Sequence, residues 1–200
     1  KNESMEHDTN GDGFMDLPKG QQANLLNRWY MKDGNYTGQY LVRGLYDERN
    51  GGQTQKYIAE NGITDPYHIG IRTWRLDAFM KQGYVFDEAK GTSIGIITSG
   101  SYHNQQNVYG HRVYDGAQGN FYLNAMFQTY FDETDKHKIT AGLSLNYDNY
   151  YEVMTSDKEE FKIPTMESAK KTLNMTRQEW IPGLFAEYSL KVDEKLSLLA

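Results

Sequence analysis

The sequence predicts an all-β protein, an antiparallel transmembrane β-barrel to which this chain contributes about eight strands. Two observations lead to this prediction. Apolar and polar residues alternate along segments of about 12–16 residues, which are longer than the usual soluble strand of about 5–6 residues. The connections between these segments are alternately short and long, as in outer-membrane barrels, where turns on one side are short and loops on the other are long.

The composition of the 200-residue chain favours strands that keep one polar face. Hydrophobic residues make up 38%, the mean hydropathy is −0.78, and tyrosine (16) and glycine (19) are abundant. A water-lined barrel fits these values because only its lipid-facing side must be apolar. No run of about 18 apolar residues occurs, so membrane-spanning helices are not expected. A net charge of −6 argues against a nucleic-acid partner, which would favour clustered Lys and Arg.

The order of strands and turns can be predicted along the whole chain. Strands are expected near 19–32, 36–48, 67–86, 92–106, 119–131, 137–150, 178–191 and 195–200. Asp33-Gly34-Asn35 is the strongest hairpin signal, because Gly and Asn tolerate positive φ. Segments 87–91, 132–136 and 192–195 supply the other short turns. The long connections are expected on the outer side of the membrane, at 49–66, 107–118 and 152–177.

The alternation gives the predicted sheet one apolar and one polar face. The apolar face is expected to meet outer-membrane lipid, and the polar face to line a lumen. Five polar residues are candidates to line a ligand path there: Arg43, Arg75, Asp77, Asn124 and Gln128. Aromatic residues near the short turns predict an interfacial girdle, although aromatic residues also favour strands in general. They are Trp29, Tyr30, Tyr36, Phe79, Tyr84, Phe86, Tyr130, Phe131 and Tyr188.

Residues 8–16 (DTNGDGFMD) form the one segment with a clear metal-binding pattern. Ca²⁺ takes six to eight oxygen ligands, which alternate residues of a coiled loop can supply, and Gly13 is placed for the tight turn. Lys19 stands where an EF-hand has its bidentate glutamate, so an EF-hand itself is not expected. The alternative is an Asp/Asn/Gly-rich turn without metal. The predicted ligands are Asp8, Asn10, Asp12, Asp16 and the carbonyl of Phe14.

No catalytic constellation is evident in the sequence. Ser101 and His103 fall on one face of a predicted strand, as a barrel hydrolase would require. However, no nucleophile-elbow motif and no orienting acid accompany them. An enzyme is therefore not expected, and the five scattered histidines are most simply exposed polar side chains.

Several segments resemble TonB-dependent outer-membrane receptors. DGFMDLP at 12–18, followed by NLLNRW at 24–29, is similar to the middle of their barrel. DERNGGQ at 47–53 is similar to an acidic-Arg-x-Gly-Gly segment that follows the next strand in such receptors. WIPGLFAEY at 180–188, followed by KLSL at 195–198, resembles a later strand pair.

The resemblance implies a barrel of 22 strands around an N-terminal plug domain, of which this chain would hold about eight strands and no plug. It implies import of a scarce nutrient, such as cobalamin or a ferric siderophore, across the outer membrane of a Gram-negative bacterium. The TonB complex would drive import through the plug, and a surface lipoprotein is a further expected partner. Within the family, the Asp8–Asp16 loop is similar to calcium-stabilised outer loops of cobalamin receptors.

One alternative remains open at this point. The chain could be a soluble extracellular calcium-binding β-domain that binds glycan or a protein partner. Such a domain would pack two apolar faces against each other and would have no apolar belt directed outward.

Overall fold

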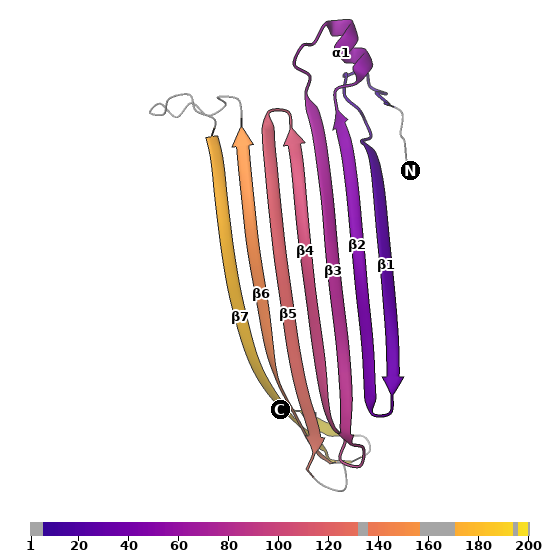
Figure 1. Ribbon diagram of the computed structural model, residues 1–200, viewed down its shortest axis with the longest axis vertical. Coiled ribbons are helices and arrows are strands. Elements are labelled where there is room, and N and C mark those ends of the chain that lie inside the picture. Colours follow the sequence, from indigo (N-terminus) through magenta and orange to yellow (C-terminus); the bar gives the residue numbers. More distant parts are fainter. Residues whose placement is uncertain (1–5, 132–135, 157–170, 194–195, 200) are drawn as a thin grey trace.

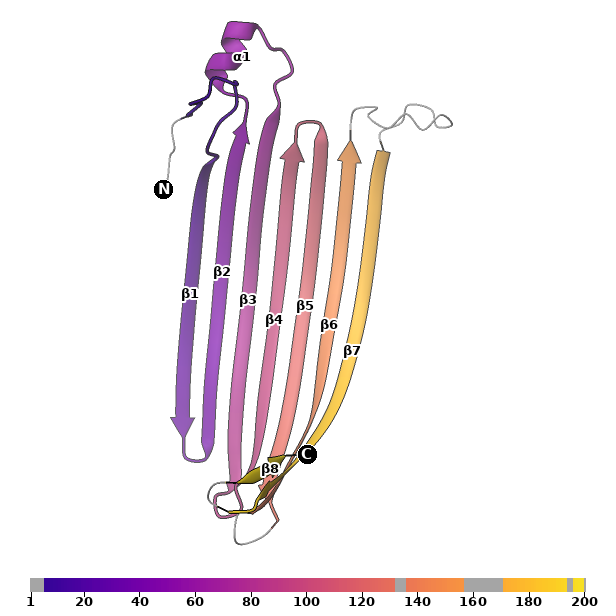
Figure 2. The same ribbon diagram turned by 180° about the vertical axis from the view of Figure 1, so that it is seen from behind.

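The computed structural model describes residues 6–131, 136–156, 171–193 and 196–199, which form a single antiparallel sheet (Figures 1 and 2). Each strand pairs with the next in sequence order. The elements are β1 (Lys19–Asp33), β2 (Tyr36–Gly52), α1 (Gln55–Asn61), β3 (His68–Asp87), β4 (Thr92–Tyr109), β5 (Arg112–Tyr130), β6 (His137–Ser156), β7 (Lys171–Lys191) and β8 (Ser197–Leu199). The predicted all-β class and antiparallel pairing are thus confirmed.

The strands β1–β7 run along the long axis of the molecule, and α1 lies beyond the ends of β2 and β3 (Figure 1). We call this the α1 end, and the opposite end, where Asp33 leads into Tyr36, the turn end. Gly34 has φ 51° in that turn, a conformation that glycine adopts without strain. No helix in the described ranges has the length and apolar character needed to cross a membrane.

The strands are longer at the α1 end than the sequence predicted. The prediction of a loop over 107–118 is wrong, because β4 and β5 continue through this segment. They meet in a two-residue turn, with Tyr109 paired to Arg112 and Gly110 at φ 60°. Polar residues such as Asn107 suggested a loop, but backbone pairing continues through this segment without strict alternation of apolar and polar residues. The connections at the α1 end are therefore not all long, contrary to the predicted order of short and long connections.

The long connections at the α1 end are also shorter than predicted. In place of a loop over 49–66, β2 continues to Gly52 and the short helix α1 follows. Thr54 caps this helix by accepting a hydrogen bond from the Tyr57 backbone N–H, and Gly62 ends it at φ 60°. The loop predicted over 152–177 shrinks because β6 extends to Ser156 and β7 begins at Lys171; the residues between them lie outside the described ranges.

The register of the sheet divides its side chains into two faces. Because side chains alternate along a strand and paired residues share a face, one choice of face extends from β1 to β7. Leu25 and Leu76 lie on the first, which we call the apolar face; Arg43 and Asp148 lie on the other, the polar face. The one register shift lies between Val85 and Asp87, at the turn end.

Two rows of aromatic side chains border the apolar face. The upper row, toward the α1 end, comprises Tyr46, Trp74, Tyr102, Phe121, Tyr147 and Trp180. The lower row, toward the turn end, comprises Trp29, Tyr36, Tyr40, Tyr84, Phe127 and Tyr188. Between these rows the apolar face carries no Asp, Glu, Lys or Arg on β1–β7. We call the area between the rows the apolar belt.

Only some of the aromatic residues predicted for a girdle share the apolar face. Tyr30, Phe79 and Tyr130, which the sequence assigned to the girdle, lie on the polar face. The upper row was not predicted at all. Two pairs of neighbours in this row are in ring contact, with centroids 4.9 Å apart for Trp74 and Tyr102 and 4.3 Å apart for Tyr147 and Trp180.

The apolar belt is exposed rather than covered by a second layer. Within the described part of the chain no hydrophobic side chain is buried. Leu184, midway between Trp180 and Tyr188 on β7, is 89% exposed. A soluble sheet of this size would bury such side chains against another layer, because exposed apolar surface in water is unfavourable.

Candidate functional site

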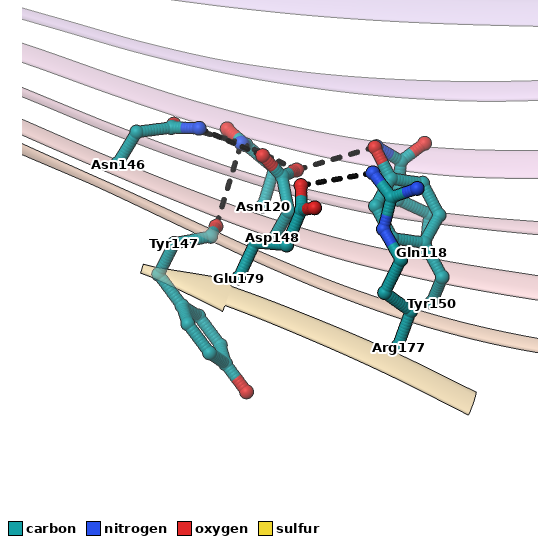
Figure 3. Close-up of polar contacts among 8 residues, drawn as sticks. All are labelled: Gln118, Asn120, Asn146, Tyr147, Asp148, Tyr150, Arg177 and Glu179. Atoms are coloured by element: carbon teal, nitrogen blue, oxygen red, sulfur yellow. Dashed lines mark hydrogen bonds and ion pairs between the residues drawn. The ribbon is translucent and has the colours of Figure 1, made fainter. Parts of the chain in front are cut away.

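The polar face carries a connected hydrogen-bond network centred on Asp148 of β6 (Figure 3). Asn120 Nδ2 donates to Asp148 Oδ1 over 2.9 Å, and Asn146 Nδ2 donates to Oδ2 over 2.7 Å. Gln118 Nε2 donates to Oδ1 over 3.4 Å and to the Tyr150 hydroxyl over 2.9 Å. Asp148 is only 9% exposed, so three amide groups hold a nearly buried carboxylate.

The network continues onto β7. The Arg177 guanidinium lies 5.3 Å from the centre of the Tyr150 ring and is paired with the Glu179 carboxylate at 2.9 Å. Figure 3 shows these side chains on one side of the sheet, whereas the Tyr147 ring points away from them. A single strand therefore supplies a polar-face carboxylate, Asp148, next to an apolar-face aromatic ring, Tyr147.

A second polar cluster joins β2 and β3. Asp77 accepts from Arg43 Nε at 2.9 Å and from Arg75 Nε at 2.7 Å, so two guanidinium groups share one carboxylate. Arg43 and Arg75 are 40% and 39% exposed, which leaves part of each guanidinium open to the polar side. The cluster has a net positive charge.

The predicted lumen residues all lie on the polar face. Arg43, Arg75 and Asp77 form the cluster just described. Asn124 donates to the Tyr122 hydroxyl at 2.9 Å, and Gln128 lies nearer the turn end. Ser101 and His103 also share this face. The paired Cα positions place Asp77 beside Ser101 and Arg75 beside His103. In the described part of the chain no hydrogen bond joins Ser101 to His103, and the nearby acid, Asp77, is held by Arg43 and Arg75.

The predicted calcium loop coils around the carboxylate of Asp8. Its Oδ1 accepts from the backbone N–H groups of Gly11 and Asp12, and its Oδ2 accepts from Gly13 over 2.8 Å. Asn10 Nδ2 donates to Asp12 Oδ2 over 3.0 Å. The loop is thus closed by its own carboxylate and amide groups.

The calcium loop packs on α1. The Gly13 carbonyl accepts from the Thr54 N–H over 2.8 Å, and a Cβ on Gly13, at φ 85°, would overlap the Tyr57 ring. Glu6 accepts from Lys19 Nζ and from the Gln55 N–H, each over 2.8 Å. The hydrogen bond from Lys19, and then that from Gln55, hold the pKa of Glu6 below its usual range. The loop and the start of α1 therefore form one unit at the α1 end.

The loop has side chains of the type that bind a hard cation, but their oxygen atoms do not converge on one point. Asp8, Asn10, Asp12 and Asp16 offer the oxygen ligands that Ca²⁺ prefers. In this conformation, however, no three acidic or histidine side chains of the described ranges converge enough to hold a metal ion. Asp16 accepts from the Thr9 N–H over 2.8 Å, which ties it to the loop's own backbone. Hydrogen bonding to the Thr9 side chain, and then to the Thr9 N–H, lowers the pKa of Asp16. Calcium would have to draw these groups inward.

Comparisons with protein-family models, with curated proteins and with solved structures found no match for this chain. The function is therefore proposed from the fold and the two faces of the sheet, together with the resemblance stated above.

Two features of the site could have been found in the sequence. The upper aromatic row lies eight to ten residues from the lower row on β3 and β7, between Trp74 and Tyr84 and between Trp180 and Tyr188. The helix α1 has a Thr cap before it and a Gly after it, both recognisable start and stop signals. By contrast, the Asp148 network forms because the register of β5 and β6 pairs Asn120 with Asp148. The sequence alone does not give this register.

Proposed function

We propose that this chain is part of the transmembrane barrel of a TonB-dependent transporter in the outer membrane of a Gram-negative bacterium. The protein would import a scarce nutrient such as cobalamin or a ferric siderophore. The exposed apolar belt between two aromatic rows is the observation that carries the membrane assignment. The transport role rests on the resemblance of segments 12–29, 47–53 and 180–198 to that family.

The height of the belt supports a membrane-spanning barrel. Trp74 and Tyr84 are ten residues apart on β3, which corresponds to about 34 Å along an extended strand. A strand tilted by about 40° covers about 26 Å of membrane normal over this length, and outer-membrane barrels have an apolar band about 25 Å tall. Tyrosine and tryptophan at both borders suit the two lipid–water interfaces.

The polar face supports a hydrated interior. A face that carries Asp148, Glu179, Arg43 and Arg75 is unsuited to hydrocarbon, because charged side chains are costly there. Long antiparallel strands with one apolar and one polar face are the pattern of outer-membrane barrels. Closure would come from further strands pairing with β1 and β8, because edge backbone groups must be paired in lipid.

The soluble calcium-binding β-domain is less well supported. It needs a second apolar layer on the belt, and none is found within the described residues, where the belt side chains are exposed. The belt also lacks charged side chains between its aromatic rows, unlike a water-facing surface.

Cell fractionation tests the membrane assignment. We expect the intact protein in the outer-membrane fraction, released by detergent but not by high salt or alkaline carbonate, because the belt binds lipid through apolar contacts. Binding through charges would be broken by salt. Recovery of a monomer in the aqueous fraction without detergent would contradict the proposal.

We further propose that the loop at Asp8–Asp16 binds Ca²⁺ from outside the cell. Asp8, Asn10, Asp12, Asp16 and the Phe14 carbonyl are the proposed ligands. A modest affinity suffices there, because extracellular calcium modules work at about 10⁻⁴–10⁻³ M. When bound, the ion would draw three carboxylates together and fix the loop that supports α1.

Calcium removal should loosen the α1 end. With EDTA, or in the Asp12→Ala variant with calcium present, we expect trypsin to cleave after Lys19 and Lys56 several-fold faster, because the loop no longer holds α1. Asp33→Ala, at the turn end of the sheet, is the matched control and should behave like wild type. Cleavage rates that respond neither to EDTA nor to Asp12→Ala would reject the calcium site.

A further inference from the structure

Basic side chains follow one another along the polar face of β1–β3. Paired residues across the sheet define rungs, and successive rungs on one face lie two residues, or about 6.8 Å, apart. Five consecutive rungs from the α1 side toward the turn end each carry one basic side chain, on β3, β2, β1, β3 and β1 in turn, and together they span about 27 Å along the strands. We call this set the cationic track; its members are Arg75, Arg43, Arg28, Lys81 and Lys32.

The track is poorly neutralised. Asp77 is the one acidic side chain that β1–β3 place on these five rungs, and it is shared by Arg43 and Arg75. Arg28 donates to the neutral Gln39 amide over 3.0 Å. Within the described ranges, no ion pair engages Lys81 or Lys32.

The same rungs on β4–β7 have the opposite balance. They carry Asp148 and Glu179 against one cation, Arg177. Asp148 is three strands from Asp77, or about 14 Å across the sheet. On these five rungs the polar face is therefore positive over β1–β3 and slightly negative over β6 and β7, so an anion at this level is favoured along the first strands.

The track ends at a hollow near the turn end. A pocket of about 320 Å³ lies there, and its polar lining includes Lys81, Gln39, Thr37 and Gln128. Gly83 and Gly95 face each other across β3 and β4, and no side chain covers them closely. Lys81 is the one charged residue among those that line the hollow, and no carboxylate lines it. Hydroxyl, amide and ammonium donors without an acid are suited to a carboxylate or phosphate group.

We propose that the cationic track guides a small polyanion along β1–β3 and that the hollow beside Lys81 binds its carboxylate or phosphate groups. Rings and lines of Arg or Lys select anions in pores, because a low-dielectric wall focuses their field. The inference rests on the barrel proposed above, since the polar face then lines the lumen. It narrows the transported compound to an anion, whereas cobalamin as a neutral compound would gain nothing from the track.

The charge of the hollow can be measured without knowing the ligand. The chain contains no cysteine, so Thr37→Cys, directly paired with Lys32, places one thiol in the hollow of the intact protein in lipid vesicles. Its reaction rates with anionic methanethiosulfonate ethylsulfonate and cationic methanethiosulfonate ethyltrimethylammonium are compared. Ala59→Cys, exposed on α1, gives the reference ratio that removes the intrinsic difference between the reagents.

We expect the anionic reagent to be favoured about tenfold in the hollow relative to the reference, and less so at high salt. Adding Lys32→Gln and Lys81→Gln should reduce this preference to within about twofold, while Lys56→Gln, which removes one positive charge on α1, should leave it unchanged. No anion preference, a preference that persists in the double variant, or no reaction with either reagent would overturn the track. If any of these occurs in a protein that still requires detergent for extraction, the track fails and the barrel proposal stands.

Discussion

Leu184→Arg is expected to destabilise the protein by about 2–4 kcal/mol, because an arginine on the lipid face near the bilayer midplane costs about that much. Leu184 lies halfway between Trp180 and Tyr188 and is the most exposed side chain of the apolar belt. The free energy of unfolding of the intact protein in lipid vesicles measures this effect. The amount of protein in the outer membrane should fall in parallel.

Ile181→Arg is the matched control for this change. Ile181 lies three residues away on the same strand and is also exposed, at 56%, but it is on the polar face. Arginine there should cost no more than about 1 kcal/mol, since the side chain remains in water. Equal destabilisation by both variants would contradict a lipid-facing belt.

Asp148→Ala is expected to cost about 1–3 kcal/mol, the penalty of leaving buried donors without an acceptor. Gln118, Asn120 and Asn146 all donate to this carboxylate, and Asp148 is almost buried. Asn120 keeps weaker acceptors, the Asn146 side chain at 3.1 Å and the Tyr147 carbonyl at 3.5 Å. Thermal unfolding of the intact protein in detergent micelles would report the loss.

Glu60→Ala serves as the control for removal of a carboxylate. Glu60 is 62% exposed on α1 and makes only a long ion pair with Lys56, at 3.9 Å. Its loss should cost at most about 0.5 kcal/mol, as for other exposed helix pairs. If Asp148→Ala were as mild as Glu60→Ala, the network would have no structural role on the polar face.

The strands between the two aromatic rows were predictable because their alternation is strict there. Trp74, Leu76 and Ala78 fall on the face opposite Arg75 and Asp77, as predicted, since every second position there is apolar. Beyond the upper aromatic row both faces mix polar and apolar residues. Alternation then disappears from the sequence although hydrogen-bonded pairing continues, so the sequence of residues 107–118 predicts a loop.

The predicted sites divide in a similar way. Alternation along each strand predicted that Arg43, Arg75 and Asp77 lie on the polar face. It did not predict their contact, which depends on the pairing of Arg43 with Asp77 across β2 and β3. The cationic track likewise needs the register of three strands, because Arg28 and Lys81 are far apart in sequence. The calcium ligands were found from a local pattern, which specifies residue types but not whether their oxygens converge.

Spin labels on single cysteines at positions 181–187 of β7 test the membrane-facing belt most directly. The 200 residues themselves contain no cysteine, so each substitution gives this part of the protein a single label. In lipid vesicles, labels at 184 and 186 should collide readily with dissolved oxygen and little with a water-soluble nickel complex, because they lie in the bilayer. Labels at 181, 183, 185 and 187 should not share that lipid signature, giving a period of two. Equal accessibility to the nickel complex at all positions, or the absence of a period of two, would contradict a transmembrane sheet.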